Sequence, residues 1–209
     1  ALMQFLFSTV MGNVSDRFGR RPVLLLTLLL LSIDYLIMAW APTLFWLFLG
    51  RLIAGIAAST YSTCYAAIAD STPADKRTQT FGIVGAAFGI GFILGPMIGG
   101  FLGSFGERLP FVAAGVLAFC NLVFGFFKMP ETLPVSERRA FVWRRANPAG
   151  TLLALRKYPV VLGLVGVYFL FMMGHHSLPS VWTYFTIERF DWSAREIGYS
   201  FAFIGVLMA

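Results

Sequence analysis

Residues 12–22 read GNVSDRFGRRP and place the charged side chains of Asp16, Arg17, Arg20 and Arg21 between two strongly apolar runs. Of the 209 residues, 58% are hydrophobic and 12% are charged, and the mean hydropathy is +0.76. This balance departs from that of a soluble domain and indicates a chain whose solvent is a lipid bilayer. The charged stretch is therefore interpreted as a polar turn between membrane-spanning helices.

The apolar runs predict an all-α polytopic membrane protein. A helix needs about 20 apolar residues to cross the hydrocarbon. A turn is expected at Pro42, because proline disfavours helical geometry in the preceding residue and lacks a backbone donor. Five full spans follow, with a shorter apolar run at each end that is interpreted as part of a span in a longer protein. The predicted segments are 1–13, 22–41, 43–69, 78–103, 109–128, 158–187 and 194–209.

Basic residues lie mainly in alternate loops. Of the sixteen, twelve fall in the odd-numbered loops and three in the even-numbered ones, and Arg51 lies within a span. The positive-inside rule therefore places the odd loops, including residues 12–22, in the cytoplasm. This bias also explains the net charge of +6 without a nucleic-acid partner.

The sequence contains no pattern that indicates an enzyme or a resident cofactor. It shows no phosphate-binding loop, no metal-ligand spacing and no nucleophile with a base at plausible depth. Adjacent residues on a helix point about 100° apart, so His175 and His176 are not expected to bind one metal ion from one face. Two interpretations of this pair stay open: ordinary polar lining, or contact with substrate or protons.

The polar turn has a simple interpretation and a functional one. It could only solvate a short loop and fix the topology. Its spacing predicts more: Gly12 ends one helix, Asp16 caps or charges the next helix, and Gly19 permits a tight turn. Basic charge at a helix N-terminus opposes the macrodipole. Arg20 and Arg21 should therefore be held by acidic partners or carbonyls elsewhere, which would make the turn a latch.

Glycines recur every four residues in the fifth segment, at positions 91, 95, 99 and 103. Such a stripe lets another helix approach closely, either as passive packing or as a seal between moving parts. Pro96 should kink this helix, because it removes one backbone donor.

Asp34 and Arg51 are charges inside predicted spans. Each costs about 2.5–3.5 kcal/mol at a helix centre. Counted from the turn at Pro42, both lie about 12 Å below the outer ends of their helices. They could form a structural ion pair, or Arg51 could face a cavity and tune the protonation of a nearby acid.

Three motifs together resemble the Major Facilitator Superfamily. Residues 12–21 match its GxxxDRxGRR signature, residues 91–100 (GFILGPMIGG) match a fifth-helix motif of drug/proton antiporters, and residues 49–55 (LGRLIAG) are similar to its fourth-helix basic motif. The surrounding sequence, including SDRFGRRPVLL and RFDWSAREIG, resembles that of the tetracycline efflux branch. One departure is Met208, which stands where that branch is expected to carry a histidine.

The resemblance implies a multi-pass protein of the inner (plasma) membrane that has twelve helices, of which this chain holds about seven, from part of the second to the start of the eighth. It assigns residues 1–128 to the N-terminal half bundle, 129–157 to the central cytoplasmic loop and 158–209 to the C-terminal half. It also implies a proton-coupled antiporter, driven by the proton gradient, that exports an amphipathic drug. A tetracycline-type drug, alone or as its magnesium chelate, is the expected substrate, and a uniporter or symporter for a small metabolite is the alternative.

The resemblance also implies roles for particular residues. The expected site residues are the cytoplasmic gate motif (Gly12, Asp16, Arg17, Gly19, Arg20, Arg21), the proton-coupling pair (Arg51, Asp34), the antiporter motif (Gly91, Gly95, Pro96, Gly99, Gly100) and two substrate-lining candidates (His175, His176).

Overall fold

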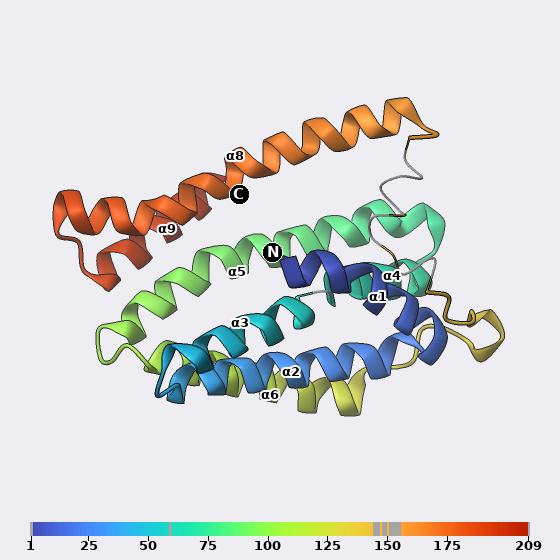
Figure 1. Ribbon diagram of the computed structural model, residues 1–209, viewed down its shortest axis with the longest axis horizontal. Helices are drawn as coiled ribbons and strands as arrows, with labels where there is room; N and C mark the ends of the chain where they lie inside the picture. Colours follow the sequence, from blue (N-terminus) through green and yellow to red (C-terminus); the bar gives the residue numbers. More distant parts are fainter. Residues whose placement is uncertain (1, 59, 144–146, 148–149, 151–155, 209) are drawn as a thin grey trace. The chain divides into compact units, whose positions relative to one another are not determined.

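The described part of the chain folds into helices, most of which are joined by short turns (Figure 1). The computed structural model describes residues 2–58, 60–143, 147, 150 and 156–208, and no β-strand is found among them. The long helices are α1 (Leu2–Phe18), α2 (Arg20–Trp40), α3 (Leu44–Ala57), α4 (Thr60–Ser71), α5 (Arg77–Gly103), α6 (Leu109–Lys128), α8 (Pro159–Phe190) and α9 (Ala194–Met208). Single 3-10 turns lie at Ala74–Lys76 and Val135–Glu137. The predicted all-α class is confirmed.

Within the described part of the chain, five helical stretches are long and apolar enough to cross a membrane. They are Arg20–Trp40, Leu44–Ser71, Ala74–Gly103, Leu109–Lys128 and Pro159–Phe190. These are the five full spans that the sequence predicts, and the expected break at Pro42 is present.

Within the predicted segment 43–69 the structure describes two helices, α3 and α4, on either side of residue 59, which lies outside the described residues. The Thr60 hydroxyl at the start of α4 donates to the Ala57 carbonyl at the end of α3.

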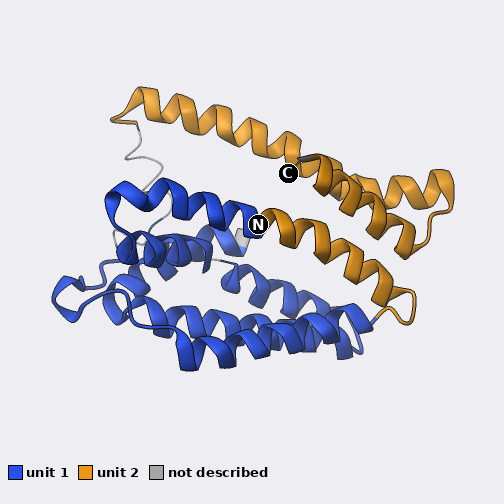
Figure 2. Cartoon of the chain, turned by 180° about the vertical axis from the view of Figure 1, so that it is seen from behind, with its two compact units in different colours: residues 1–87, 108–148 blue, residues 88–107, 149–209 orange. Residues whose placement is uncertain are grey.

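Contacts divide the chain into two compact units, which Figure 2 shows in different colours. One comprises residues 1–87 and 108–148, and the other residues 88–107 and 149–209. Helix α5 contributes to both units. The assignment of 1–128 and 158–209 to half bundles stays a prediction. The predicted central loop 129–157 includes residues 144–146, 148–149 and 151–155, which lie outside the described residues.

The first unit buries small and polar side chains and exposes large apolar ones. Its most deeply buried side chains are Thr27, Thr63, Asp34, Ser15 and Ser32. Many Leu, Phe and Val side chains on the same helices are exposed. This is the pattern expected in lipid, where large apolar groups lose nothing at the surface and small residues let helices approach one another.

Helices α2 and α6 illustrate this packing and lie side by side (Figure 1). Gly115 of α6 is buried, and a Cβ atom added to it would lie 3.1 Å from a methyl carbon of Leu36. The Ser32 hydroxyl of α2 donates a 3.1 Å hydrogen bond to the Gly115 carbonyl. Absence of a side chain at position 115 therefore permits both the close approach and the interhelical hydrogen bond.

Within the second unit, the C-terminal part of α5 meets α9 through glycines. A Cβ atom added to Gly100 would lie 2.6 Å from the Ala194 carbonyl oxygen and 3.1 Å from the Gly198 Cα. A Cβ atom added to Gly198 would in turn collide with the Pro96 carbonyl. The two backbones are thus in direct contact, and the contact includes Pro96 and Gly100 of the predicted antiporter motif.

This contact lies on a different face of α5 from the predicted glycine stripe. A Cβ atom added to Gly91, Gly95 or Gly99 would meet no described atom within 4 Å. Gly100 follows Gly99 by one residue and therefore points about 100° away from it. The expectation that the 91/95/99 stripe makes the close helix contact is not met within this chain. Helix α5 continues without interruption through Pro96.

We predict that Gly100→Val destabilises the full-length protein more than its neighbour substitution Gly99→Val does. Both changes add the same β-branched side chain to the same helix, but only Gly100 faces a backbone, and overpacking costs about 1–3 kcal/mol. Thermal unfolding of the purified protein in detergent measures the difference. Equal unfolding temperatures for the two variants would show that α5 and α9 do not pack closely at Gly100.

Candidate functional site

Arg20 lies at the centre of the latch, defined here as residues 12–21. Its Nη1 atom lies 2.6 Å from Asp16 Oδ1 and donates to the Ser15 hydroxyl at 2.6 Å. Its Nε atom donates to Asp70 Oδ2 at 3.0 Å. Arg20 is only 8% exposed. The guanidinium therefore connects α1, α2 and α4, and loss of either carboxylate would leave this nearly buried charge with a single acidic partner.

The other two arginines of the latch differ in their surroundings. Arg21 donates from Nη2 to the Phe126 carbonyl at 2.6 Å, and its guanidinium lies 5.8 Å from the centre of the Phe126 ring. Arg17 is exposed and lies over the Phe18 ring at 5.1 Å. The prediction that Arg20 and Arg21 are held by acidic groups or carbonyls elsewhere is confirmed.

The turn of the latch is shorter than predicted. Helix α1 continues through Gly12 to Phe18, so the expectation that Gly12 ends a helix is wrong. A glycine within a helix costs only about 1 kcal/mol. In the next turn Ser15 and Asp16 bind the Arg20 side chain, which stabilises the helix there. Gly19 alone separates α1 from α2, with a φ of 105°, which confirms its predicted role.

Asp16 does not cap the following helix as predicted, because its carboxylate pairs with the Arg20 side chain. The Glu131 carboxylate accepts from the first backbone N–H groups of α2 instead, at 2.8 Å from Arg20 and 3.3 Å from Arg21. Asp16 therefore supplies negative charge near the start of α2, and Glu131 caps that helix.

Asp34 lies in the C-terminal half of α2 and Arg51 in the middle of α3, and the two side chains do not form an ion pair. Asp34 is 2% exposed, and its Oδ1 atom accepts no hydrogen bond from the described residues. No ion pair within 4.0 Å joins it to Arg51, whose Nη2 atom donates to the Met38 sulfur. Gly50 leaves room for the carboxylate, since a Cβ atom there would lie 2.8 Å from Asp34 Oδ1. The structural ion pair is therefore excluded in this conformation.

The two histidines project from the middle of α8. Both are exposed, and the His175 ring stacks on the Phe171 ring with centres 6.1 Å apart. Pro179 lies four residues after His175 and donates no N–H to its carbonyl. The His175 carbonyl thus lacks the usual helical donor four residues later, and the role of both histidines as substrate-lining residues stays a prediction.

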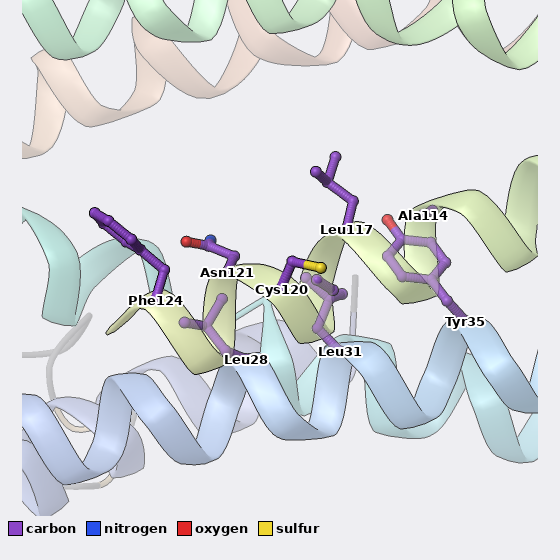
Figure 3. A pocket seen from close by; sticks show the side chains of 9 residues that line it. Leu28, Leu31, Tyr35, Ala114, Leu117, Cys120, Asn121 and Phe124 are labelled. Atoms are coloured by element: carbon purple, nitrogen blue, oxygen red, sulfur yellow. The ribbon is translucent and has the colours of Figure 1, made fainter. Parts of the chain in front are cut away.

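A groove of about 610 Å³ runs between α2 and α6 (Figure 3). Leu28 and Leu31 of α2 and Leu117 and Phe124 of α6 make its wall largely apolar. Tyr35 and Asn121 add a hydroxyl and a carboxamide. Tyr35 follows Asp34 directly in α2 but points about 100° away from it, so the groove and the buried carboxyl group occupy different faces of that helix.

The arrangement of helices and motifs matches known proteins over the whole chain. The family profile of the Major Facilitator Superfamily matches residues 1–209. The chain belongs to the Major Facilitator Superfamily. It is 44% identical over its full length to the class C tetracycline resistance protein of Escherichia coli, of which it covers 52%, and 38% identical over 99% of its length to the class H protein of Pasteurella multocida, of which it also covers 52%.

A solved structure supports the same fold. The crystal structure of the human organic anion transporter MFSD10 matches 99% of the chain with a TM-score of 0.79 and 32% sequence identity. The chain covers 52% of that transporter. It therefore spans about half the length of the relatives it matches, as the resemblance predicted. Membership of the superfamily makes the chain a multi-pass protein of the inner (plasma) membrane.

Two acidic residues that bind the latch, Asp70 and Glu131, were not predicted from the sequence. Asp70 stands at the end of α4, and Glu131 follows α6 in the run Met129-Pro130-Glu131. Each lies where a membrane-spanning segment ends, and the latch arginines lack acidic partners of their own except Asp16. Those two facts could have suggested the pairing, but not its geometry.

We predict that Arg20→Lys impairs transport by the full-length protein more than Arg17→Lys does. A lysine keeps the charge but has no planar fork with which to bridge two carboxylates, and loss of a hydrogen bond between charged groups costs about 1.5–3 kcal/mol. Arg17 lies over the Phe18 ring and forms no ion pair with the described residues, so it is the matched control. Drug efflux per unit of membrane-inserted protein is the measurement. Equal efflux by the two variants would mean that the bridge has no part in transport.

Proposed function

We propose that the full-length protein is a proton-coupled antiporter that exports an amphipathic small molecule by alternating access. The observation that carries the proposal is Asp34, a carboxyl group that is 2% exposed inside a membrane-spanning helix and has no ion-pair partner within 4.0 Å among the described residues. Ionisable groups at such depth are expensive and usually mark the path of an ion or a proton. Covalent chemistry is not part of the proposal.

Arg51 supplies the second element of the proposed coupling. Its side chain is exposed and bound to Met38, one turn of α2 from Asp34. A long arginine side chain can move between these two partners without displacing the helices. In the proposed cycle Arg51 turns to Asp34 when that carboxyl group loses its proton, and it returns to Met38 when the proton is regained. The two charge states then favour different conformations of the bundle.

The relatives guide the choice of substrate. Tetracycline resistance proteins suggest a tetracycline-type drug, taken alone or as its magnesium chelate. The similarity to a human organic anion transporter favours a second class, an organic anion. Met208 also departs from the histidine expected in the tetracycline branch, which favours this second class. Both kinds of molecule combine an apolar body with polar groups.

We predict that Asp34→Asn abolishes coupling while it preserves the fold. The asparagine side chain has nearly the shape of a carboxyl group but cannot take up and release a proton near neutral pH. Uptake of tetracycline into inverted vesicles, driven by a proton gradient, should therefore fall by about tenfold or more. Exchange of tetracycline across the membrane without a gradient should continue.

Ser32→Ala is the matched control, because Ser32 is equally buried on the same helix and its hydroxyl donates to the Gly115 carbonyl. It should lower thermal stability by about 1 kcal/mol and leave the response to the gradient intact. Undiminished gradient-driven uptake by a stable Asp34→Asn protein would refute a role for Asp34 in proton coupling. If an organic anion is driven by the gradient and tetracycline is not, the second substrate class is correct.

A further inference from the structure

We propose that Glu131 positions the latch, and that the segment following α6 is thereby part of the gate. This inference rests on the proposed function for its effect on transport, but its structural content does not. The segment is called the strap and comprises residues 131–139. All of its contacts described below lie within the first compact unit.

The Glu131 carboxylate gathers donors from two parts of the chain. Its Oε1 atom accepts from the backbone N–H groups of Arg20, at 2.8 Å, and of Leu133, at 3.0 Å. Its Oε2 atom accepts from the N–H group of Arg21 at 3.3 Å and lies 3.8 Å from Arg138 Nη2. One side chain therefore holds the first turn of α2 against the start of the strap.

Helix α2 needs such a group. The first N–H groups of any helix lack acceptors within the helix, and a side chain at the N-cap usually supplies one. Here the N-cap is Gly19, which has no side chain. Two arginines in the first turn also oppose the helix dipole, and a carboxylate at that end offsets them. Glu131, which lies 111 residues after Arg20 in the sequence, supplies both the missing acceptor and the negative charge.

The contact between Glu131 and α2 also requires glycine at position 19. The φ of 105° at this position already favours glycine. A Cβ atom added there would also collide with the Glu131 carboxylate and lie 2.9 Å from Arg138 Nη2. The glycine of the motif therefore makes room for the strap as well as for the turn.

A second contact fixes the far end of the strap. The Arg139 N–H group donates to the Asp16 carbonyl of α1 at 3.0 Å. Between the two ends, Leu133 is 6% exposed and lines a polar pocket of about 490 Å³ with Arg20 and Asp70. The strap thus covers the arginine that joins α1, α2 and α4.

These contacts couple the strap to any motion that separates α2 from α4. The backbone of Arg20 is held by Glu131, and its side chain is held by Asp16 and Asp70. Any motion that separates α2 from α4 at this point must therefore strain the Glu131 contacts or carry the strap with it. Because the strap continues from α6, the end of α6 and the beginning of the central loop take part in opening the latch.

The test measures opening of the strap directly. In the full-length protein, with Cys64→Ala, Cys120→Ala and any cysteine outside residues 1–209 also replaced, Leu133→Cys places a thiol beneath the strap. Maleimide labelling of that thiol in native membranes should be about tenfold faster with Glu131→Ala, because loss of a helix cap shifts a local equilibrium by this order. Glu131→Gln keeps one acceptor oxygen and should give an intermediate rate. Glu107→Gln removes an exposed carboxylate in the turn before α6, outside the strap, so it is the control and should leave the rate unchanged.

Transport provides the second measurement. Glu131→Ala should lower the maximal rate of tetracycline efflux at an unchanged KM, and Glu131→Gln should restore part of that rate. A labelling rate unaffected by Glu131→Ala would overturn the proposal, as would a loss of transport that follows only the amount of inserted protein. If Glu131→Ala does not insert, the Glu131→Gln labelling rate decides alone. Labelling needs neither substrate nor a proton gradient, so failure of the antiporter proposal would leave this result interpretable.

Discussion

The bridge made by Arg20 is the interaction on which the described half of the protein depends. Helices that are apolar on every exposed face can slide in lipid without loss of hydrophobic burial, so their mutual position must be fixed by small-residue contacts and by polar groups. One nearly buried guanidinium, bound to Asp16 and Asp70, fixes α1, α2 and α4 at their shared end. The single-residue turn at Gly19 and the cap supplied by Glu131 hold that guanidinium in place.

Charges in this chain separate into two kinds with different consequences. In the latch, Arg20 binds Ser15, Asp16 and Asp70 at once, so its contacts hold three helices together as a unit. Asp34 is the opposite case, a buried carboxyl group with an unsatisfied oxygen and a movable arginine nearby. A transporter of the proposed kind needs both: one group that responds to the proton, and one contact that has two discrete states.

Much of the fold could be predicted from the sequence, because a bilayer imposes the length of each span and proline at position 42 imposes a turn. The motif also predicted that Arg20 and Arg21 need partners. The partners themselves could not be predicted, since Asp70 lies in the second helix after α2 and Glu131 follows the fourth, and they meet the latch only in the packed bundle. The extent of α1 was missed because a glycine at position 12 weakens a helix only slightly, and tertiary contacts decide the outcome. The face of α5 that meets α9 was missed because glycines occupy two faces of that helix, and the partner selects one of them.

The central claim is that Asp34 exchanges its proton for substrate. It is tested most directly by the proton release that accompanies binding of tetracycline to the purified full-length protein in weakly buffered detergent solution. Because binding and protonation are reciprocally linked, the account predicts that the wild-type protein releases more protons than the Asp34→Asn variant, by about one per molecule. Equal release by the two proteins, at equal occupancy by the drug, would contradict it.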